Sequence, residues 1–318
     1  MTVPTSGRAL RLGSRKSPMA IAQSRLVAGM ITERTGRQVE IVGVTTLGDV
    51  SRDQLTQIGG TGVFVSALRE ALAGGEVDLA VHSLKDLPAG AAAGITLAAV
   101  PPRDDPRDAL IAREGAKLAD LPAGARIGTG SPRRAAQLLA LRADLRCVPI
   151  RGNAGTRLSQ VTDGELDGVV LACAGLARIG QAAAVTQVFE LDEMLPAPGQ
   201  GALAVECRDG EPELAALLAA VNDEASMAAA VAERSLLEAL AAGCSAPVGG
   251  YAAGTDELVM HAVVLSADGT RALRMQGNAP AADARRLGAD LAAELLRRGA
   301  ADLVSSPMAP TDSGNDVQ

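Results

Sequence analysis

The chain has 318 residues, which is long enough for two or three domains with a substantial core. Its 47% hydrophobic and 21% charged residues are typical of a globular protein. The net charge of −7 and the 1% of aromatic residues exclude a general attraction to nucleic acid and a base-stacking surface, so we expect no nucleic-acid partner.

No apolar run reaches the roughly 20 residues that a membrane span needs, and the N-terminal stretch lacks an apolar signal core. We therefore expect a cytoplasmic protein without a membrane partner. Its cysteines are widely scattered and form no C-x-x-C pair. This pattern argues against a disulfide framework and a zinc site, and we expect no bound metal.

The first 200 residues alternate short apolar or β-branched runs with alanine-rich stretches, which predicts an α/β fold with helices on both faces of its sheets. Ligands of such folds bind beyond the carboxyl ends of the strands. Helices are expected after Ser17, Gly62, Ser131 and Asn153. Strands are expected at 9–14, 39–45, 78–84, 95–100, 126–130, 145–152 and 167–175.

Two of the predicted helix starts are similar in sequence, "RLGSRKSPMAIAQ" at 11–23 and "RIGTGSPRRAAQ" at 126–137. Arg133 and Arg134 stand in a first helical turn, where the helix dipole disfavours cations. Such arginines fit a site where an anion docks on the helix N-terminus, and the two stretches then face each other across a cleft. The alternatives are solvated arginines on a capped helix and a common Ser-Pro helix opening.

The strand expected at 78–84 ends in polar and charged residues, His82, Ser83, Lys85 and Asp86. This is where active-site residues of open α/β sheets lie. Asp86 is a candidate acid or charge stabiliser, and Lys85 a candidate anion ligand. The alternative is a local Lys85–Asp86 ion pair at the strand end.

Another basic turn, "RGNAGTR" at 151–157, places Arg151 and Arg157 around two glycines. Together with Arg11, Arg15, Arg133 and Arg134, it indicates a ligand with several carboxylates or phosphates, although such a turn can also be plain surface. A phosphate loop is absent and the dinucleotide fingerprint is incomplete, so a nucleotide-dependent enzyme is disfavoured.

The stretches 101–110 and 195–208 have the composition of crossings between modules. After about residue 220, a long alanine-rich helix, two strand-like runs and an amphipathic helix predict a small α+β domain, and the tail is expected to be disordered. Cys244 lies between Gly243 and Ser245 in a loop of this domain, where its thiol is accessible. The alternative is an inert small hydrophobe.

Eight stretches in order along the chain closely resemble the porphobilinogen deaminase family, also called hydroxymethylbilane synthases. They are "LRLGSRKSPMAIAQ", "GGTGVFVSALREAL", "VDLAVHSLKDLPA", "PRDDPRDAL", "IGTGSPRRAAQL", "IRGNAGTRLSQV", "LPAPGQGALAVECR" and "GCSAPVGGYA". The resemblance implies a transferase of haem and porphyrin biosynthesis that joins four porphobilinogens into hydroxymethylbilane with release of ammonia. It also implies a monomer that uses a dipyrromethane cofactor.

For the fold, the resemblance implies two similar periplasmic-binding-protein-like lobes around a cleft and a small α+β C-terminal domain. The first lobe is then formed by 1–102 and 202–220, the second by 103–201 and the third domain by 221–306, followed by a disordered tail at 307–318. The C-terminal domain carries the cofactor cysteine.

For the site, the resemblance implies that Cys244 holds the cofactor through a thioether and that Asp86 is catalytic. A nearby carboxylate stabilises the cationic azafulvene left when ammonia departs and can shuttle protons. The implied cofactor-binding residues are Ser83, Lys85, Asp86, Thr129, Ser131, Arg133, Arg134 and Arg157. The implied substrate-binding residues are Arg11, Arg15, Ser17, Gln23, Arg151, Arg178 and Gln200.

The ligand chemistry agrees with the basic helix starts, because each porphobilinogen carries two carboxylates that a single cleft must neutralise. Many relatives place lysines before Phe64, where this chain has Gln57 and Thr61. A two-lobed solute-binding or ligand-sensing module is the alternative function. Such a module would have no use for Cys244 or Asp86.

Overall fold

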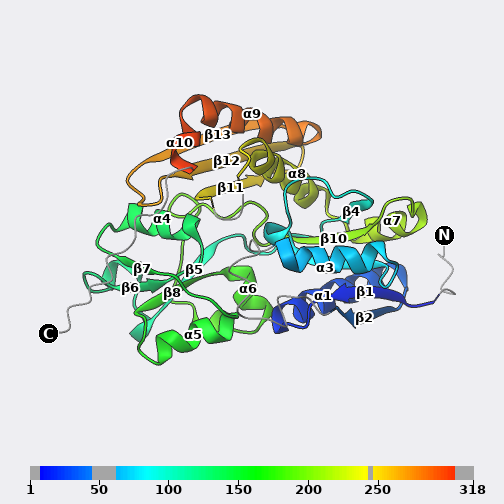
Figure 1. The fold of residues 1–318 in the computed structure, drawn as a ribbon, viewed down its shortest axis with the longest axis horizontal. Helices are drawn as coiled ribbons and strands as arrows, with labels where there is room; N and C mark the ends of the chain where they lie inside the picture. Colours follow the sequence, from blue (N-terminus) through cyan, green and yellow to red (C-terminus); the bar gives the residue numbers. More distant parts are fainter. Residues whose placement is uncertain (1–7, 45–61, 243–245, 305–318) are drawn as a thin grey trace.

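The computed structural model describes residues 8–44, 62–242 and 246–304, with the side chains of 62–64 left out. Two five-stranded sheets, each flanked by helices, form two lobes side by side, and a third unit with a three-stranded sheet packs across both of them (Figure 1). This arrangement confirms the predicted fold class of two similar α/β lobes and a smaller α+β unit.

The two large sheets share one strand pattern. The first has the order β2-β1-β3-β10-β4 and the second β7-β6-β8-β5-β9, with β10 and β5 antiparallel to their neighbours β3 and β8. The first sheet contains β1 (Leu10–Ser14), β2 (Val39–Gly43), β3 (Leu79–Ser83), β4 (Ile95–Ala99) and β10 (Leu203–Arg208). The second contains β5 (Asp108–Ala112), β6 (Arg126–Gly128), β7 (Arg146–Val148), β8 (Gly168–Ala172) and β9 (Gln187–Val188).

Each antiparallel strand follows a segment that crosses between the lobes. The stretch 101–110 therefore does more than cross, because its last residues begin β5 at Asp108. In both lobes, the first residue of the antiparallel strand lies opposite the last residue of the central parallel strand. Leu203 pairs with Ser83 in the first lobe, and Asp108 pairs with Ala172 in the second.

Helices begin at or directly after Ser17, Gly62, Ser131 and Asn153, as predicted, and polar side chains cap three of them. The strand expected at 167–175 is shorter than predicted, because a helix begins at Cys173. Ser17 accepts a hydrogen bond from the amide of Ala20, and Asn153 accepts one from Thr156. The helices of the lobes are α1 (Pro18–Thr35), α3 (Gly62–Ala73), α4 (Pro132–Leu141), α5 (Ala154–Thr162), α6 (Cys173–Arg178) and α7 (Pro212–Leu218). A 3-10 turn, η2 (Leu84–Asp86), follows β3.

The third unit has three antiparallel strands where the sequence predicted two strand-like runs. Its elements are α8 (Glu224–Ala239), β11 (Val248–Ala253), β12 (Glu257–Leu265), β13 (Ala272–Pro280), α9 (Ala284–Arg297) and α10 (Ala300–Val304). The turn between β12 and β13 packs on α4 of the second lobe. Gly269 is required there, because a Cβ atom would lie 2.3 Å from the carbonyl oxygen of Ala136.

Within the described ranges, no single helix has the length and apolar character to cross a membrane. The segments 212–221 and 224–239 meet these criteria only as a pair, and the chain bends by 106° between them.

Candidate active site

A cleft of about 1060 Å³ lies between the lobes, at the carboxyl ends of β1 and β3 and beside α5 and α6. Among the residues that the structure describes, five cations and one carboxylate line it, so its field favours anionic ligands. The wall from β8 and α6 has small side chains, among them Ala172, Ala174 and Gly175. The predicted site residues in the lining are Arg15, Ser17, Gln23, Ser83, Lys85, Asp86, Arg134, Arg157 and Arg178.

The carboxylate of the cleft, Asp86, lies in the η2 turn directly after β3. Because β3 is buried along most of its length, the position of the η2 turn at the cleft is fixed. Asp86 is partly exposed and makes no hydrogen bond or ion pair with any residue that the structure describes. Its oxygens are therefore available to a ligand in the cleft.

Lys85 does not form the local ion pair that the sequence left open. In the described part of the chain no salt bridge joins it to Asp86, and its Nζ atom lies 3.4 Å from Oε1 of Gln200. Burial, together with the nearby charge of Arg134, lowers the pKa of Lys85 to about 8, against the opposing pull of Asp86 and Asp108. About half of the Lys85 side chains are therefore charged at a pH of about 8.

Arg133 and Arg134 bind a carboxylate of the protein itself. Asp108 is fully buried, and its two oxygens lie 2.8 Å from Nη2 of Arg133 and 2.7 Å from Nη2 of Arg134. Burial alone would raise the pKa of Asp108, but the two guanidiniums, helped by Gln200, hold it at about 2. The carboxylate stays ionised and supplies the counter-charge at this helix start.

The two arginines nevertheless point to different parts of the protein. Arg134 lines the cleft, where it also donates to the carbonyl of Val170 at 3.0 Å. Arg133 is 3% exposed and donates to the carbonyl of Leu195 at 2.7 Å, on the side of the third unit. The expectation that Arg133 grips a ligand carboxylate is therefore corrected, since Asp108 and Leu195 occupy its guanidinium inside the protein.

Gln200 and Arg178 connect the cleft to the crossings between the lobes. Gln200 is 1% exposed and donates to Oδ1 of Asp108 at 2.9 Å, so it acts on the cleft through Lys85 and Arg134. Arg178 reaches Asp104 in one crossing at 2.8 Å and the carbonyl of Gly201 in the other at 2.6 Å. Both residues brace the crossings behind the cleft.

Arg157, in the first turn of α5, lies in the cleft lining, where its Nε donates to the carbonyl of Gly152 in the preceding turn at 3.0 Å. Burial lowers the pKa of Arg157, and the charge of Arg134 adds to this effect. Arg151 is exposed and lies outside the lining. Thr129 and Ser131 also lie outside it, and Ser131 caps α4 by accepting from the amide of Arg134.

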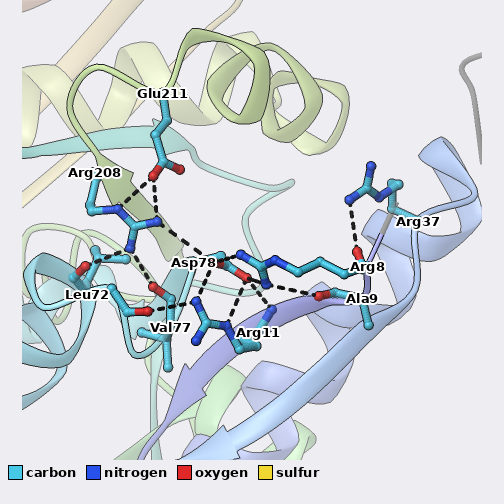
Figure 2. A network of polar contacts seen from close by, with 10 residues as sticks. Arg8, Ala9, Arg11, Arg37, Leu72, Val77, Asp78, Arg208 and Glu211 are labelled. Carbon is cyan, nitrogen blue, oxygen red and sulfur yellow. Dashed lines mark hydrogen bonds and ion pairs between the residues drawn. The ribbon is translucent and has the colours of Figure 1, made fainter. Parts of the chain in front are cut away.

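Arg11 lies away from the cleft, which corrects its predicted role in substrate binding. Its guanidinium binds Asp78 at 2.9 Å and the carbonyl of Gly75 at 2.7 Å, within a cluster that also holds Arg8 and Arg208 (Figure 2). Asp78 precedes β3, whereas Lys85 follows it, and five strand residues span about 16 Å. Burial would raise the pKa of Asp78, but the hydrogen bonds from Arg8 and Arg11 outweigh it and lower this pKa well below the usual range.

Cys244, the predicted point of cofactor attachment, lies outside the described residues, as do Gln57 and Thr61. The functional residue that sequence reasoning missed is Asp108. It stands in a proline-rich and charge-rich stretch whose composition predicts only a crossing between modules. One signal in the sequence could have found it. Asp108 directly precedes the apolar run "ALIA", and a carboxylate at the start of a buried strand needs a paired cation.

Fold and cleft together define a two-lobed α/β protein with a cationic cleft built around one carboxylate. Comparison with known proteins is more specific. The family model "Porphobilinogen deaminase, dipyromethane cofactor binding domain" matches residues 10–216, and the model of the family's C-terminal domain matches 227–297. The chain therefore belongs to the porphobilinogen deaminase family.

Individual relatives agree over nearly the whole chain. The porphobilinogen deaminase of Thermobifida fusca is 55% identical over 309 residues, covering 94% of this chain and 97% of that protein. Porphobilinogen deaminase 1 of Streptomyces coelicolor is 52% identical over 311 residues, covering 93% and 98%. Among solved structures, a methionine binding protein has a TM-score of 0.43 at 13% identity, covering 67% of this chain and 88% of that one.

Proposed function

We propose that the cleft joins four porphobilinogen molecules head to tail into hydroxymethylbilane and releases one ammonia for each. The observation that carries this proposal is Asp86, a carboxylate without a partner among the described residues in a cleft lined by five cations. The cations suit a substrate with two carboxylates, and the lone carboxylate suits the positive charge that develops when ammonia leaves. Membership of the family supports the same reaction.

The residues of the cleft also suit the dipyrromethane named in the family model, because its acetate and propionate groups are anionic. When bound, this group supplies the pyrrole carbon at which the new chain is extended. We propose that Lys85, Arg134 and Arg157 hold its carboxylates, that the ammonium of Lys85 also reaches a carboxylate of the incoming substrate, and that Cys244 forms the thioether, with Ser83 in the same lining. Thr129, Ser131, Arg133 and Gln200 then support these ligands from behind.

The reaction asks two things of Asp86. The substrate's methylene carbon loses its bond to nitrogen as ammonia departs, and the charge left on the azafulvene is stabilised by the carboxylate. The pyrrole carbon that attacks this methylene must lose its proton once the carbon–carbon bond has formed, and an oxygen of Asp86 would accept it. The proposed ligands of the incoming substrate in the lining are Arg15, Ser17, Gln23 and Arg178. Arg151 is exposed outside the lining, in the turn before α5, and is proposed as a further contact at the edge of the cleft.

The setting follows from the same observations. We infer domains at 1–102 with 202–220, at 103–201 and at 221–306, supported by the place of β10 in the first sheet; the tail 307–318 lies outside the described residues. One chain supplies both walls of the cleft, which supports a monomer. Cys147, Cys173 and Cys207 are free thiols, which supports a reducing cytoplasm without a membrane partner.

The test is to incubate the purified protein with porphobilinogen and to measure ammonia and the uroporphyrin that forms spontaneously from the product. Intact-mass and peptide mapping of the same sample should place two linked pyrrole units on Cys244. An unmodified mass in active protein would refute the attachment. Binding of porphobilinogen without ammonia would instead favour a ligand-sensing module.

A further inference from the structure

The turn that carries Lys85 and Asp86 is held on one side by the second crossing. The amide of Leu84 donates to the carbonyl of Ala202 at 3.0 Å. Gly199 packs so closely that a Cβ atom would lie 2.9 Å from the amide nitrogen of Lys85. Gly199 and Gly201 of this crossing have φ values of +79° and +89°, so glycine alone fits both positions without strain.

On its other side, the same segment is held by a residue of the third unit. Arg234, from α8, donates to three successive carbonyls directly after Asp86, those of Leu87 at 3.3 Å, Pro88 at 2.7 Å and Ala89 at 3.0 Å. Burial lowers the pKa of Arg234, and the charge of Glu206 opposes this effect. A guanidinium has enough donors in one plane to fix several carbonyls at once.

The neighbouring residue of α8 holds the crossing. Glu233 is fully buried and accepts from the amide of Gly199 at 2.5 Å, and it pairs with Arg103 at 2.6 Å. Its Oε1 also accepts from the amide of Ala252 in β11 at 2.8 Å. Two adjacent residues of α8 thus hold both neighbours of the Lys85–Asp86 turn. Glu233 binds the crossing at Gly199, and Arg234 binds the segment 87–89.

We propose that Arg234 is a positioning residue for Asp86, which couples the third unit to the geometry of the cleft. The inference rests on the proposed function, because it assigns a purpose to the placement of Asp86. Arg234 does not line the cleft, so it acts through the backbone of 87–89. A carboxylate must be held within about half an ångström of its productive position to act fully on a developing charge.

The test compares Arg234→Gln and Arg234→Lys with the matched control Arg285→Gln. Arg285 is 73% exposed on α9 and pairs with Glu238 at 3.0 Å, so its loss removes a surface contact of α8. The first measurement is hydrogen exchange at the amides of Leu84 and Leu87. We expect exchange at least about tenfold faster in Arg234→Gln than in wild type or the control, because three charge-assisted hydrogen bonds are lost.

The second measurement is turnover of each variant as holoenzyme, with primer loading verified by mass. We expect kcat to fall about tenfold in Arg234→Gln with KM within twofold, and Arg234→Lys to recover part of both kcat and protection. Equal exchange in Arg234→Gln and Arg285→Gln would overturn the proposal, as would a normal kcat. If the wild type released no ammonia while exchange still responded to Arg234, the proposed function would fail and the clamp would stand.

If Arg234→Gln does not fold, Arg234→Lys decides the question. Lysine keeps the positive charge but cannot reach three carbonyls from one ammonium. Faster exchange at Leu84 and Leu87 in this variant, with a melting temperature close to that of the control, supports the clamp. Wild-type exchange and wild-type kcat in Arg234→Lys would overturn it.

Discussion

The two lobes have the same strand order and similar helix starts, yet they differ in the charged residues at equivalent positions. In the first lobe, the helix start at Ser17 lines the cleft, and the antiparallel strand β10 begins with the apolar Leu203. In the second, the first turn of α4 carries two arginines, and β5 begins with Asp108 at the equivalent register. The second lobe thus carries an internal counter-ion where the first has a hydrophobic residue.

The ends of the central strands differ in the same manner. After β3 the chain continues into Lys85 and Asp86, whereas after β8 it continues into Cys173, Ala174 and Gly175. One lobe therefore presents the carboxylate, and the other presents cations and a wall of small residues that leaves room for a ligand. Two similar helix starts can therefore have different roles. In the second lobe, Asp108 neutralises the arginines of the helix start inside the protein, so they depend less on a ligand for a counter-charge.

The largest effect is expected from removing that side chain. Asp108→Asn leaves Arg133 and Arg134 buried without a counter-charge, and breaking such a buried pair costs about 3–5 kcal/mol in the free energy of unfolding. Thermal and denaturant unfolding would measure the loss. Asp144→Asn, which removes an exposed partner of Arg142, is the control and should unfold close to wild type.

The pH dependence of stability provides a second check on Asp108. Its pKa of about 2 in the folded protein lies below the ordinary 3.8, so the folded state binds the proton less tightly than the unfolded one. The resulting stability is present above about pH 4 and is lost as pH falls toward 2. Wild type should therefore lose more stability over this range than Asp108→Asn, and parallel curves would contradict the assignment.

On the first lobe, Asp86→Asn should abolish most turnover while leaving the fold intact. The amide keeps the size of the side chain but loses the charge that we propose stabilises the azafulvene and the oxygen that we propose accepts protons. Removing such a preorganised group costs on the order of a hundredfold or more in rate. The assay must use protein that carries the primer by mass. Near-normal turnover in loaded Asp86→Asn would remove Asp86 from the mechanism.

How far the sequence could predict this site depends on the range of each signal. The strand–helix rhythm, the caps at Ser17 and Ser131 and the polar strand end at Asp86 are local patterns, and the structure has the elements where these patterns predict them. The partner of Arg133 is 25 positions away in the chain and that of Arg11 is 67 positions away, so no local pattern contains them. The sequence alone therefore assigns both arginines to a ligand, whereas the fold provides each of them with an aspartate.

The two arginines of α4 can be separated experimentally. Arg134→Gln should raise KM or impair primer loading about tenfold or more, since a buried charge-assisted contact is worth about 1.5–3 kcal/mol. Arg133→Gln should lower the melting temperature with little change in KM, because its partners are Asp108 and Leu195. Arg297→Gln, 72% exposed on α9, is the control. Equal effects of the two substitutions on KM would show that both arginines bind a ligand carboxylate, as the sequence predicts.

The smallest expected effect concerns Lys85, the cation that the first lobe adds beside Asp86. Because burial and Arg134 lower the pKa of Lys85 to about 8, its charge declines as pH rises through this value, while the arginines of the cleft stay protonated. KM for porphobilinogen should therefore rise a few-fold between about pH 7 and 9 in wild type. Lys85→Arg keeps its charge throughout and should show a flatter profile. Since any titration of the substrate itself affects both proteins alike, the ratio of their KM values isolates Lys85, and a ratio independent of pH would show that its ammonium does not bind the substrate's carboxylates.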